Sequence, residues 1–588
     1  MKKRMLLALV LLLAGFQILN AIPAHPGKIV YTQPDGKKIV LQRHGDEFYH
    51  WTTNAAGKVV RLDPDGFYRE HSEEPVSEAR RSAAAHRSAV NQTRMARAAG
   101  AVKGQRHFLV ILVEFSDLSY TTCEDPRTAF SALLNEKGYS ENGGTGSARD
   151  YFYENSNGEF DPIFDVFGPV VLPENKYYYG GNNWSGDDRN PGQAVIDGCK
   201  LLDDEVDFTQ YDSDGDGEVD MLLMYYAGYG EADSNDDDAI WPHEWSLSGQ
   251  GKSLTLDGVR IDTYSCTNEK NGPSTGNVGK MCGIGTACHE FGHALGLPDM
   301  YDTDYDGTSG ETGGLYSYSV MCSGSYNNAG RTPPYYCFEE RRFLGWMSDS
   351  DCLEFEKTGT YSIQPVNSNM IYRTNTDMAG EYFLYENRTK KGWDKYIPEE
   401  GLIVYHVDKS SRRVGHSTAK SLWDDWESSN AINANGKHPC CYIIPANDQD
   451  NLNYVRSNAF DVKPGVAFPY KNITSYVPLS WNGVEGIITF SQIAFKDGVV
   501  TLRAYVPTGD VDYVTIADAG SYRAGDRFTF SLVCPEEVDA PKSVVWYYDD
   551  EPAGADSVTL TKGAHTVEAQ LTNADGSRSV LTLEINVK

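Results

Sequence analysis

The sequence predicts a multidomain α+β protein, and three observations lead to this prediction. The chain has 588 residues, more than one hydrophobic core usually holds. An apolar run at Phe108–Phe115 and a helix-forming segment that begins near Ile284 indicate a mixed α+β region. Beyond Gly345, strand-like runs recur at short spacing. We therefore divide the chain into residues 1–21, 22–103, 104–350, 351–507 and 508–588.

The amino terminus has the three parts of a secretory signal peptide. Three basic residues follow Met1, an apolar run extends from Met5 to Phe16, and small residues lead to Ala21. The run is too short to span a bilayer comfortably, and no other segment approaches the roughly twenty apolar residues of a membrane helix. We therefore expect residues 1–21 to be removed and the protein to be secreted.

The chain is strongly acidic, with a formal net charge of −31, and loss of the three basic residues of the signal peptide would make it −34. Such a surface repels nucleic acid and anionic lipid, so we expect neither as a partner. The eleven cysteines are an odd number, so at least one has no partner within the chain. Their sparse scatter does not indicate a disulfide scaffold.

Residues 22–103 begin with short β-like runs, such as 38–42, and continue into a polar stretch rich in alanine and arginine from Glu73 to Ala99. That stretch has few apolar residues and suits a linker that proteases could cut. The segment contains no cysteine. If it is inhibitory, it cannot act through a thiolate, so it must block its target sterically or offer an oxygen or imidazole group. An accessory domain that stays attached is the alternative.

The segment His289-Glu-Phe-Gly-His293-Ala-Leu-Gly296-Leu-Pro-Asp299 predicts a catalytic zinc site within residues 104–350. On a helix, His289 and His293 lie four residues apart and share one face, so both imidazoles can bind one ion. Glu290 would face the water on that ion. Gly296 permits a sharp turn that can bring Asp299 back as the third ligand. Three protein ligands leave a fourth position open, as in catalytic rather than structural zinc sites.

Two alternatives to this interpretation stay open. A core helix with two hydrogen-bonded histidines could carry the same motif. The third ligand could also be Glu311, as in thermolysin-like enzymes. Four glycines surround Glu311, however, and glycine costs about 1 kcal/mol per helical position. Asp299 is therefore the preferred third ligand.

A second segment, Tyr318-Ser-Val-Met321-Cys-Ser-Gly-Ser-Tyr326, lies about thirty residues downstream, at the distance typical of the methionine turn beneath the zinc of metzincins. A lone methionine usually fills a core. Following the zinc motif, Met321 is predicted to form that turn.

Residues 284–302 and 319–326 resemble the immune-inhibitor-A-like family of secreted zinc metallopeptidases. The similarity also covers 107–117, 147–156, 240–245 and 381–388, and so spans roughly 104–505. The resemblance implies a metzincin-like zinc peptidase domain and makes residues 22–103 a propeptide. It also implies zinc on His289, His293 and Asp299, with Asp299 at the position of the third histidine of the common metzincin pattern.

The acidic segment 212–220 predicts a calcium site. Oxygen donors stand at alternate positions around a glycine turn, in a spacing that suits a hard cation. An EF-hand would end in a glutamate where this chain has Leu223, so part of the ligation must come from elsewhere, and an acidic turn without an ion is the alternative. A second loop, 302–307, has similar spacing. The predicted ligands of the first loop are Asp212, Asp214, Asp216, Glu218 and Asp220.

The remaining chain is predicted to be β-rich. Strand-like runs between residues 382 and 505 have the spacing of a β-sandwich, which we assign to 351–507. A boundary follows at Pro507-Thr-Gly-Asp. Residues 508–588 alternate apolar and polar positions and resemble a small immunoglobulin-like module.

The preferred function is that of a secreted zinc-dependent endopeptidase made as a zymogen, with Glu290 as general base. We expect a monomer that acts on protein or peptide substrates. An extracellular adhesin or glycan-binding protein with a vestigial zinc site is one alternative, and the intact Glu290 argues against it. A zinc amidase acting on a non-protein substrate is another, because the metal chemistry is the same.

Overall fold

The computed structural model groups the chain into two compact units. One unit contains the chain up to Glu354 together with Thr360–Gly486 and Phe490–Arg503, and the other contains Phe355–Gly359, Ile487–Thr489 and Ala504–Lys588. Within the described ranges, no helix is long and apolar enough to cross a membrane. The described residues are 22–47, 50–71, 102–183, 187–303, 312–412, 430–449, 462–486, 488–506, 515–517, 521–534, 539–549, 551–574 and 578–588.

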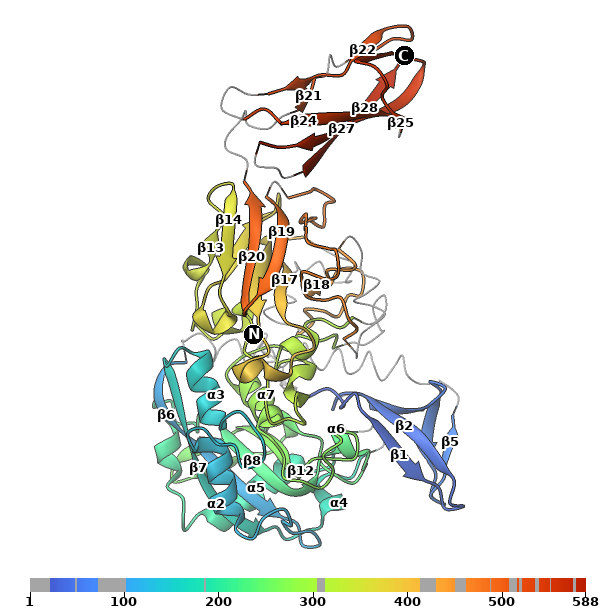
Figure 1. Ribbon diagram of the computed structural model, residues 1–588. Helices are drawn as coiled ribbons and strands as arrows, with labels where there is room; N and C mark the ends of the chain where they lie inside the picture. The colour runs from blue at the N-terminus through green and yellow to red at the C-terminus, as the bar shows by residue number, and fades with distance from the viewer. Residues whose placement is uncertain are drawn as a thin grey trace, which may run out of the picture. The chain divides into compact units, whose positions relative to one another are not determined.

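An antiparallel five-stranded sheet opens the first unit (Figure 1). Its strands follow one another in sequence order, and Ile29, Leu41, Val60 and Tyr68 form a small core on it. The predicted strand at 38–42 is confirmed as part of β2, whereas the predicted signal peptide and the helical stretch 73–99 lie outside the described residues. The strands are β1 (Lys28–Thr32), β2 (Lys38–Gly45), β3 (His50–Asn54), β4 (Val59–Leu62) and β5 (Tyr68–Glu70).

A second five-stranded sheet forms the centre of the next part, in the order β7-β6-β8-β12-β9. Neighbouring strands are parallel except β9, which runs antiparallel to β12 at the edge. The apolar run predicted at Phe108–Phe115 falls in and just after β6. The strands are β6 (Gly104–Glu114), β7 (Phe160–Val171), β8 (Leu222–Tyr229), β9 (His243–Ser246) and β12 (Thr263–Lys270), and a separate hairpin joins β10 (Leu254–Leu256) to β11 (Val259–Ile261).

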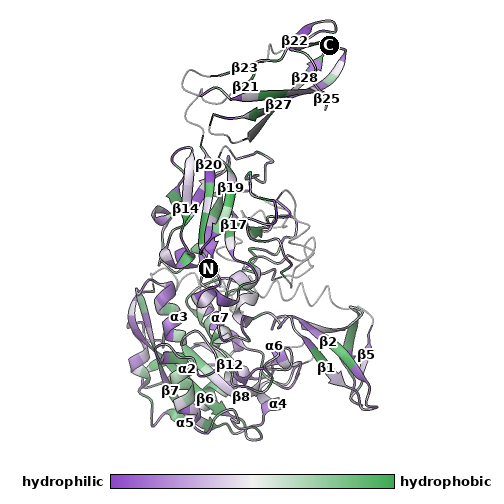
Figure 2. Cartoon of the chain, in the orientation of Figure 1, coloured by the Kyte–Doolittle hydropathy of each residue, from purple (hydrophilic) through white to green (hydrophobic). Residues whose placement is uncertain are grey.

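Both faces of this sheet are buried, which explains why β6 is apolar from Phe108 to Val113. Alternate side chains of β6 enter different cores: Phe108, Val110 and Leu112 one, and Leu109 and Ile111 the other. This is the two-residue period of a strand. Figure 2 shows the hydrophobic residues along the strands of this region.

Helices cover the two faces of the sheet. α2, α3 and α7 contribute Phe130, Phe152 and Phe291 to the first core, and α5 contributes Val195 and Leu202 to the second. The Phe291 ring of α7 lies 4.8 Å from that of Phe108, centroid to centroid, so α7 is fixed to β6 by edge-to-face packing. The helices are α2 (Pro126–Asn135), α3 (Ala148–Asn155), α4 (Lys176–Tyr179), α5 (Pro191–Leu202), α6 (Glu231–Ser234), α7 (Gly285–Ala294) and α8 (Phe338–Phe343).

Two further sheets follow in the first unit. Tyr385 of β16 contacts Phe490 of β19, with ring centroids 4.8 Å apart, so the sheets meet through aromatic side chains. Ile403 and Ile443 belong to the same core as Phe291, so this part shares buried apolar surface with the α7 region. The β-sandwich at 351–507 stays a prediction. The first sheet is β13 (Leu353–Glu354), β15 (Tyr372–Asn375), β16 (Glu381–Arg388), β17 (Gly401–Asp408) and β18 (Cys441–Ile444), and the second is β14 (Gly359–Ile363), β20 (Val499–Tyr505) and β19 (Thr489–Lys496).

The second unit is built from strands around its own core, which includes Phe528, Val567, Leu571 and Ile585. Its four-stranded sheet has the order β25-β24-β27-β28. The immunoglobulin-like fold stays a prediction. The strands are β21 (Thr515–Ile516), β22 (Arg527–Thr529), β23 (Leu532–Val533), β24 (Ser543–Tyr548), β25 (Glu551–Pro552), β26 (Ser557–Thr559), β27 (Gly563–Thr572) and β28 (Arg578–Val587).

Candidate metal centre

The two histidines of the motif project from α7 toward one point. His289 and His293 are fully buried, and their Nε2 atoms lie 3.0 Å apart. The Nδ1 of His289 lies 2.7 Å from the carbonyl of Val320, and that of His293 lies 2.8 Å from the carbonyl of Leu297. Because a carbonyl only accepts, each Nδ1 carries a hydrogen, so Nε2 is the nitrogen whose lone pair a neutral ring would present to a metal.

Asp299 completes a set of three donors. The helix ends at Ala294, and Gly296 adopts a φ of +106°, which turns the chain back. The Oδ1 of Asp299 then lies 3.2 Å from the Nε2 of His293 and 3.4 Å from that of His289. Two lone pairs and a carboxylate oxygen this close together repel one another unless a cation lies between them. The donor set therefore fits zinc.

Charge and burial compete at Asp299. Burial disfavours the charged carboxylate, but the two histidines outweigh it and hold the pKa of Asp299 well below its usual value. An ionised carboxylate is the form that binds a metal.

Glu290 lies on α7 between the two histidines and is fully buried. Its Oε1 accepts a hydrogen bond of 2.9 Å from the backbone nitrogen of Ile22. It also falls within one compact group with His289 and His293 whose ligand atoms lie within 4.8 Å of one another. Glu290 is therefore placed to act on a molecule bound beside the two histidines.

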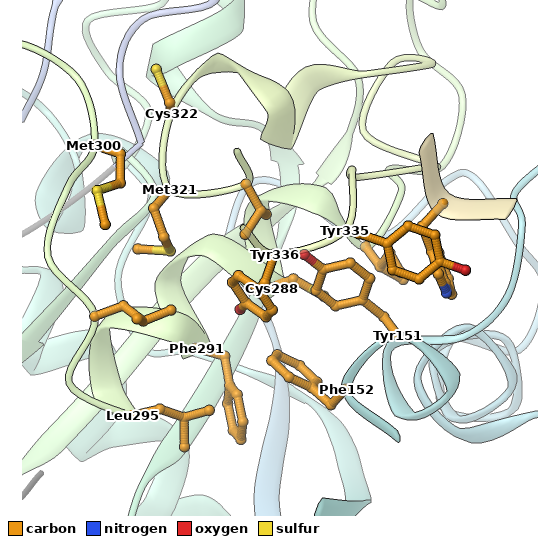
Figure 3. Packing of buried hydrophobic residues seen from close by; sticks show 14 of the residues in the cluster. Tyr151, Phe152, Cys288, Phe291, Leu295, Met300, Met321, Cys322, Tyr335 and Tyr336 are labelled. Carbon is orange, nitrogen blue, oxygen red and sulfur yellow. The ribbon is translucent and has the colours of Figure 1, made fainter. Parts of the chain in front are cut away.

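Met321 lies close to Gly292 of α7, in the same cluster as Cys288 and Phe291, and its role in a methionine turn stays a prediction (Figure 3). The backbone nitrogen of Met321 donates a hydrogen bond of 2.9 Å to Ser319 Oγ. The Ser319 hydroxyl donates a hydrogen bond to the buried carboxylate of Glu340. A Cβ placed on Gly292 would lie 2.8 Å from the Met321 sulfur, so this helix position needs glycine. The segment also supplies the Val320 carbonyl that orients His289.

Asn430 is a site residue that the sequence did not reveal. Its Oδ1 accepts a hydrogen bond of 2.7 Å from the backbone nitrogen of Asp299, and its Nδ2 donates a hydrogen bond of 2.6 Å to Asp299 Oδ2. Both bonds join residues 131 positions apart, so no local spacing could have indicated them. Such partners fix the orientation of a metal-binding carboxylate.

The start of the described chain lies in the site. Ile22 contacts Glu290, and its carbonyl also accepts a hydrogen bond of 3.0 Å from the indole nitrogen of Trp241. The Pro23 carbonyl accepts a hydrogen bond of 2.6 Å from the Tyr326 hydroxyl. The backbone nitrogen of His25 donates 2.9 Å to the Ala232 carbonyl. Tyr326, which follows the methionine turn, thus binds this segment.

The acidic loop lies between residue 211 and β8. Asp212, Asp214 and Asp216 bring carboxylate oxygens within 4.8 Å of one another. Glu218 pairs instead with Arg260, and Asp220 accepts from the hydroxyl of Ser213. The structure thus gathers three of the five predicted ligands. Residues 304–307 of the second predicted loop, and Glu311, lie outside the described residues.

All eleven cysteines lie in described parts of the chain, and all are free thiols. Cys288 of α7 is fully buried, and burial raises its pKa well above the usual value. Cys288 does not belong to either described group whose ligand atoms converge.

Comparison with known proteins assigns the central part of the chain. Residues 94–345 match the family model described as immune inhibitor A peptidase M6, catalytic domain. Immune inhibitor A of Bacillus thuringiensis subsp. alesti is 29% identical over 279 residues, which are 40% of this chain and 39% of that protein. The pre-pro-metalloprotease PrtV of Vibrio cholerae serotype O1 (strain M66-2) is 28% identical over 262 residues, which are 38% of this chain and 28% of PrtV. The chain thus matches well under half the length of either relative.

Among solved structures, wild-type OgpA from Akkermansia muciniphila aligns with 83% of this chain and 95% of its own length. The sequence identity is 9% and the TM-score is 0.23, values too low to support an argument about fold or function.

Proposed function

We propose that this protein, whose residues 94–345 match the catalytic domain of the immune inhibitor A peptidase family, is a secreted zinc-dependent endopeptidase made as a zymogen. The observation that carries the proposal is the convergence of three donor atoms. The Nε2 atoms of His289 and His293 and the Oδ1 of Asp299 lie within 3.4 Å of one another, beside Glu290. The enzyme would hydrolyse peptide bonds of extracellular proteins, and it would act as a monomer.

The proposed mechanism assigns proton transfer to Glu290. Zinc bound by His289, His293 and Asp299 would polarise the scissile carbonyl and lower the pKa of water toward ~7. Glu290 accepts a proton from the attacking water on its carboxylate. It then delivers that proton to the nitrogen of the leaving amine. Burial of Glu290 beside the donor set keeps both transfers within the site.

Latency is proposed to come from residues 22–103 as a propeptide. The backbone nitrogen of Ile22 lies at Glu290 where the nitrogen of a leaving amine would lie, and Ile22–His25 are held by Trp241, Tyr326 and Ala232. A substrate cannot enter while this segment is bound. Of the modes of inhibition expected from sequence, steric blocking is the one this contact supports.

Two further properties belong to the proposal. Export depends on the predicted signal peptide, 1–21, which lies outside the described residues. Calcium would bind the loop of Asp212, Asp214 and Asp216, because three carboxylates that repel one another around a turn favour a hard cation. Glu218 and Asp220 would join only if they exchanged their present partners, Arg260 and Ser213.

The experiment that tests the function is a peptide-library digest with the processed protein. We expect cleavage at internal peptide bonds, its loss with a chelator, and its return when zinc is added back. Peptides left intact by the zinc-loaded, processed protein would contradict the proposal. Hydrolysis confined to non-peptide amides would make the protein an amidase instead.

A further inference from the structure

A buried arginine joins the propeptide to the peptidase region. Arg43 of β2 has a side chain only 6% exposed. Its guanidinium forms an ion pair with Glu231 and donates a hydrogen bond of 2.7 Å to Asp237 Oδ1. It also lies over the ring of Trp241, 5.9 Å from the centroid, within cation–π range. Arg43 thus occupies a recess with two carboxylates and an aromatic face.

His50 enters the same recess. Its ring stacks on Trp241 with centroids 4.9 Å apart, and its Nε2 lies 3.1 Å from Glu231 Oε1. Within the described ranges, both side chains that pair with Glu231 in this way therefore come from residues 22–71. Lys176 of the peptidase region pairs with Asp236 instead.

Removal of the propeptide would take both of these partners away from Glu231. Glu231 is fully buried, and its Oε2 accepts no hydrogen bond from any described residue. Asp188 lies close by with a side chain 6% exposed, and burial, with the charge of Glu231, raises its pKa well above the usual value. Glu231 Oε1 keeps a hydrogen bond of 2.9 Å from Asn182 Nδ2, which is a neutral donor. A buried carboxylate without a cationic partner is costly, so the processed enzyme favours a cation at this place.

The recess suits an organic cation rather than a metal ion. The described groups whose ligand atoms converge as a metal requires lie at His289 and at Asp212, and neither includes Glu231. The Trp241 ring, over which the Arg43 guanidinium lies, attracts a guanidinium or an ammonium and offers no ligand to a metal. Arg43 itself shows that a guanidinium fits.

Trp241 connects the recess with the catalytic base. Its ring covers Arg43, while its indole nitrogen donates 3.0 Å to the carbonyl of Ile22. The backbone nitrogen of Ile22 lies 2.9 Å from Glu290. In the proposed mechanism, the Ile22 nitrogen occupies the position of the leaving amine. The residues after Ile22 therefore follow the direction of the substrate residues that come after the scissile bond. The recess therefore lies beside the primed part of the cleft.

From these contacts we propose that Glu231, Asp237 and Trp241 form a subsite for an arginine or lysine side chain on the primed side of a peptide substrate. In the precursor Arg43 fills this subsite. The inference rests on the proposed peptidase function, because only removal of residues 22–103 opens the recess. It makes Glu231 a residue that determines substrate specificity, distinct from the groups that carry out the hydrolysis.

Binding measurements test the subsite without requiring catalysis. The processed protein carrying Glu290→Ala is titrated with peptides that hold arginine at one primed position, scanned along the peptide, and with matched peptides that hold citrulline, which is neutral and of nearly the same shape. We expect the arginine peptide to bind at least tenfold more tightly at one primed position. Glu231→Gln should remove the difference between the two peptides, and Asp237→Asn should reduce it. Equal binding of both peptides at every primed position would overturn the proposal.

A matched control separates the subsite from general acidity. Asp238→Asn removes an exposed carboxylate from the same loop and should leave the arginine preference unchanged. If Asp238→Asn weakened the preference as much as Glu231→Gln, diffuse charge would explain it and the subsite would be wrong. If Glu231→Gln failed to fold, the half-exposed Asp237 would carry the test.

Failure of this inference differs from failure of the proposed function. Hydrolysis of the library without a basic preference on the primed side would refute the subsite and leave the peptidase intact. An arginine preference in binding without any hydrolysis would support the subsite and refute the peptidase.

Discussion

The side chain of Asn430 forms two hydrogen bonds with Asp299. Its Oδ1 accepts a bond of 2.7 Å from the Asp299 backbone nitrogen, and its Nδ2 donates a bond of 2.6 Å to Asp299 Oδ2. The carboxylate that completes the donor set is thus oriented by a residue 131 positions later in the chain. Because Oδ2 is engaged by Asn430, Oδ1 is the oxygen left facing the two histidines.

We predict that Asn430→Ala weakens zinc binding by on the order of 10–100-fold, since partners of metal-binding groups typically contribute this much. Zinc affinity measured by competition with a chelator is the direct test. Asn435→Ala is the matched control, because Asn435 bonds to Lys437 rather than to the site. Equal zinc affinity in Asn430→Ala and the parent protein would show that Asn430 does not position Asp299.

The contact of Ile22 with Glu290 predicts that the uncut precursor is nearly inactive. Cleavage between about Arg80 and Arg106 should release residues 22–103 and activate the protein, because that stretch suits protease access. Activity before and after limited proteolysis, with the new amino terminus mapped, provides the measurement. Full activity in the uncut precursor would make residues 22–103 an accessory domain and leave the zinc assignment unchanged.

A single substitution tests the same contact inside the precursor. Ile22 is fully buried in an apolar cluster with Ala232 and Trp241, so Ile22→Asp would bury a carboxylate there and expel the segment. We expect precursor activity to rise at least tenfold. Val30→Asp is the control, because Val30 is 61% exposed on β1. A similar gain in both variants would mean that general loosening of the propeptide, and not the Ile22 contact, controls latency.

Calcium is expected to raise the melting temperature of the protein, because an ion that binds only the folded state stabilises it by mass action. Asp214→Ala combined with Asp216→Ala should abolish this gain. The control pair, Asp203→Ala with Asp204→Ala, removes two exposed acids from a neighbouring turn and should keep it. If calcium does not change the melting temperature of the parent protein, the loop is an acidic turn that binds no ion.

Asp233 predicts a loss of stability with rising pH. Burial raises its pKa to about 7, despite a hydrogen bond of 2.8 Å from the backbone nitrogen of Gly272. The folded state therefore keeps a proton that the unfolded chain releases near pH 4. The free energy of unfolding then falls as pH rises from about 4 to about 7, by on the order of 4 kcal/mol from this group.

Asp233→Asn should remove that part of the pH dependence. Denaturant unfolding of both proteins between pH 4 and 8 gives the comparison, and the curves should converge at low pH and separate above neutrality. A constant difference between the two curves across this range would exclude titration of Asp233.

The sequence predicted the parts of the site that depend on local spacing. His289, Glu290 and His293 follow from the helical period, and Asp299 follows from the turn that Gly296 permits. Asn430 and Ile22 were not predictable, because they reach the site from distant segments through contacts without a motif. The same limit holds for the pairing of Arg43 with Glu231.

The fold shows a similar division. The apolar run at Phe108–Phe115 predicted a buried strand, since a parallel strand covered on both faces is apolar at every position. The order β7-β6-β8-β12-β9 could not be predicted, because strand order depends on which long-range pairings form. In the acidic loop, alternation correctly grouped Asp212, Asp214 and Asp216 but could not reveal that Arg260 competes for Glu218.

The central claim is that Glu290 acts as the general base beside zinc held by His289, His293 and Asp299. The measurement that tests it most directly is the activity and zinc content of the processed Glu290→Ala protein. We predict that hydrolysis falls by at least ~10²-fold, the lower end of what general acid–base catalysis contributes, while bound zinc stays near one per chain. Activity close to that of the parent, with zinc still bound, would contradict the account.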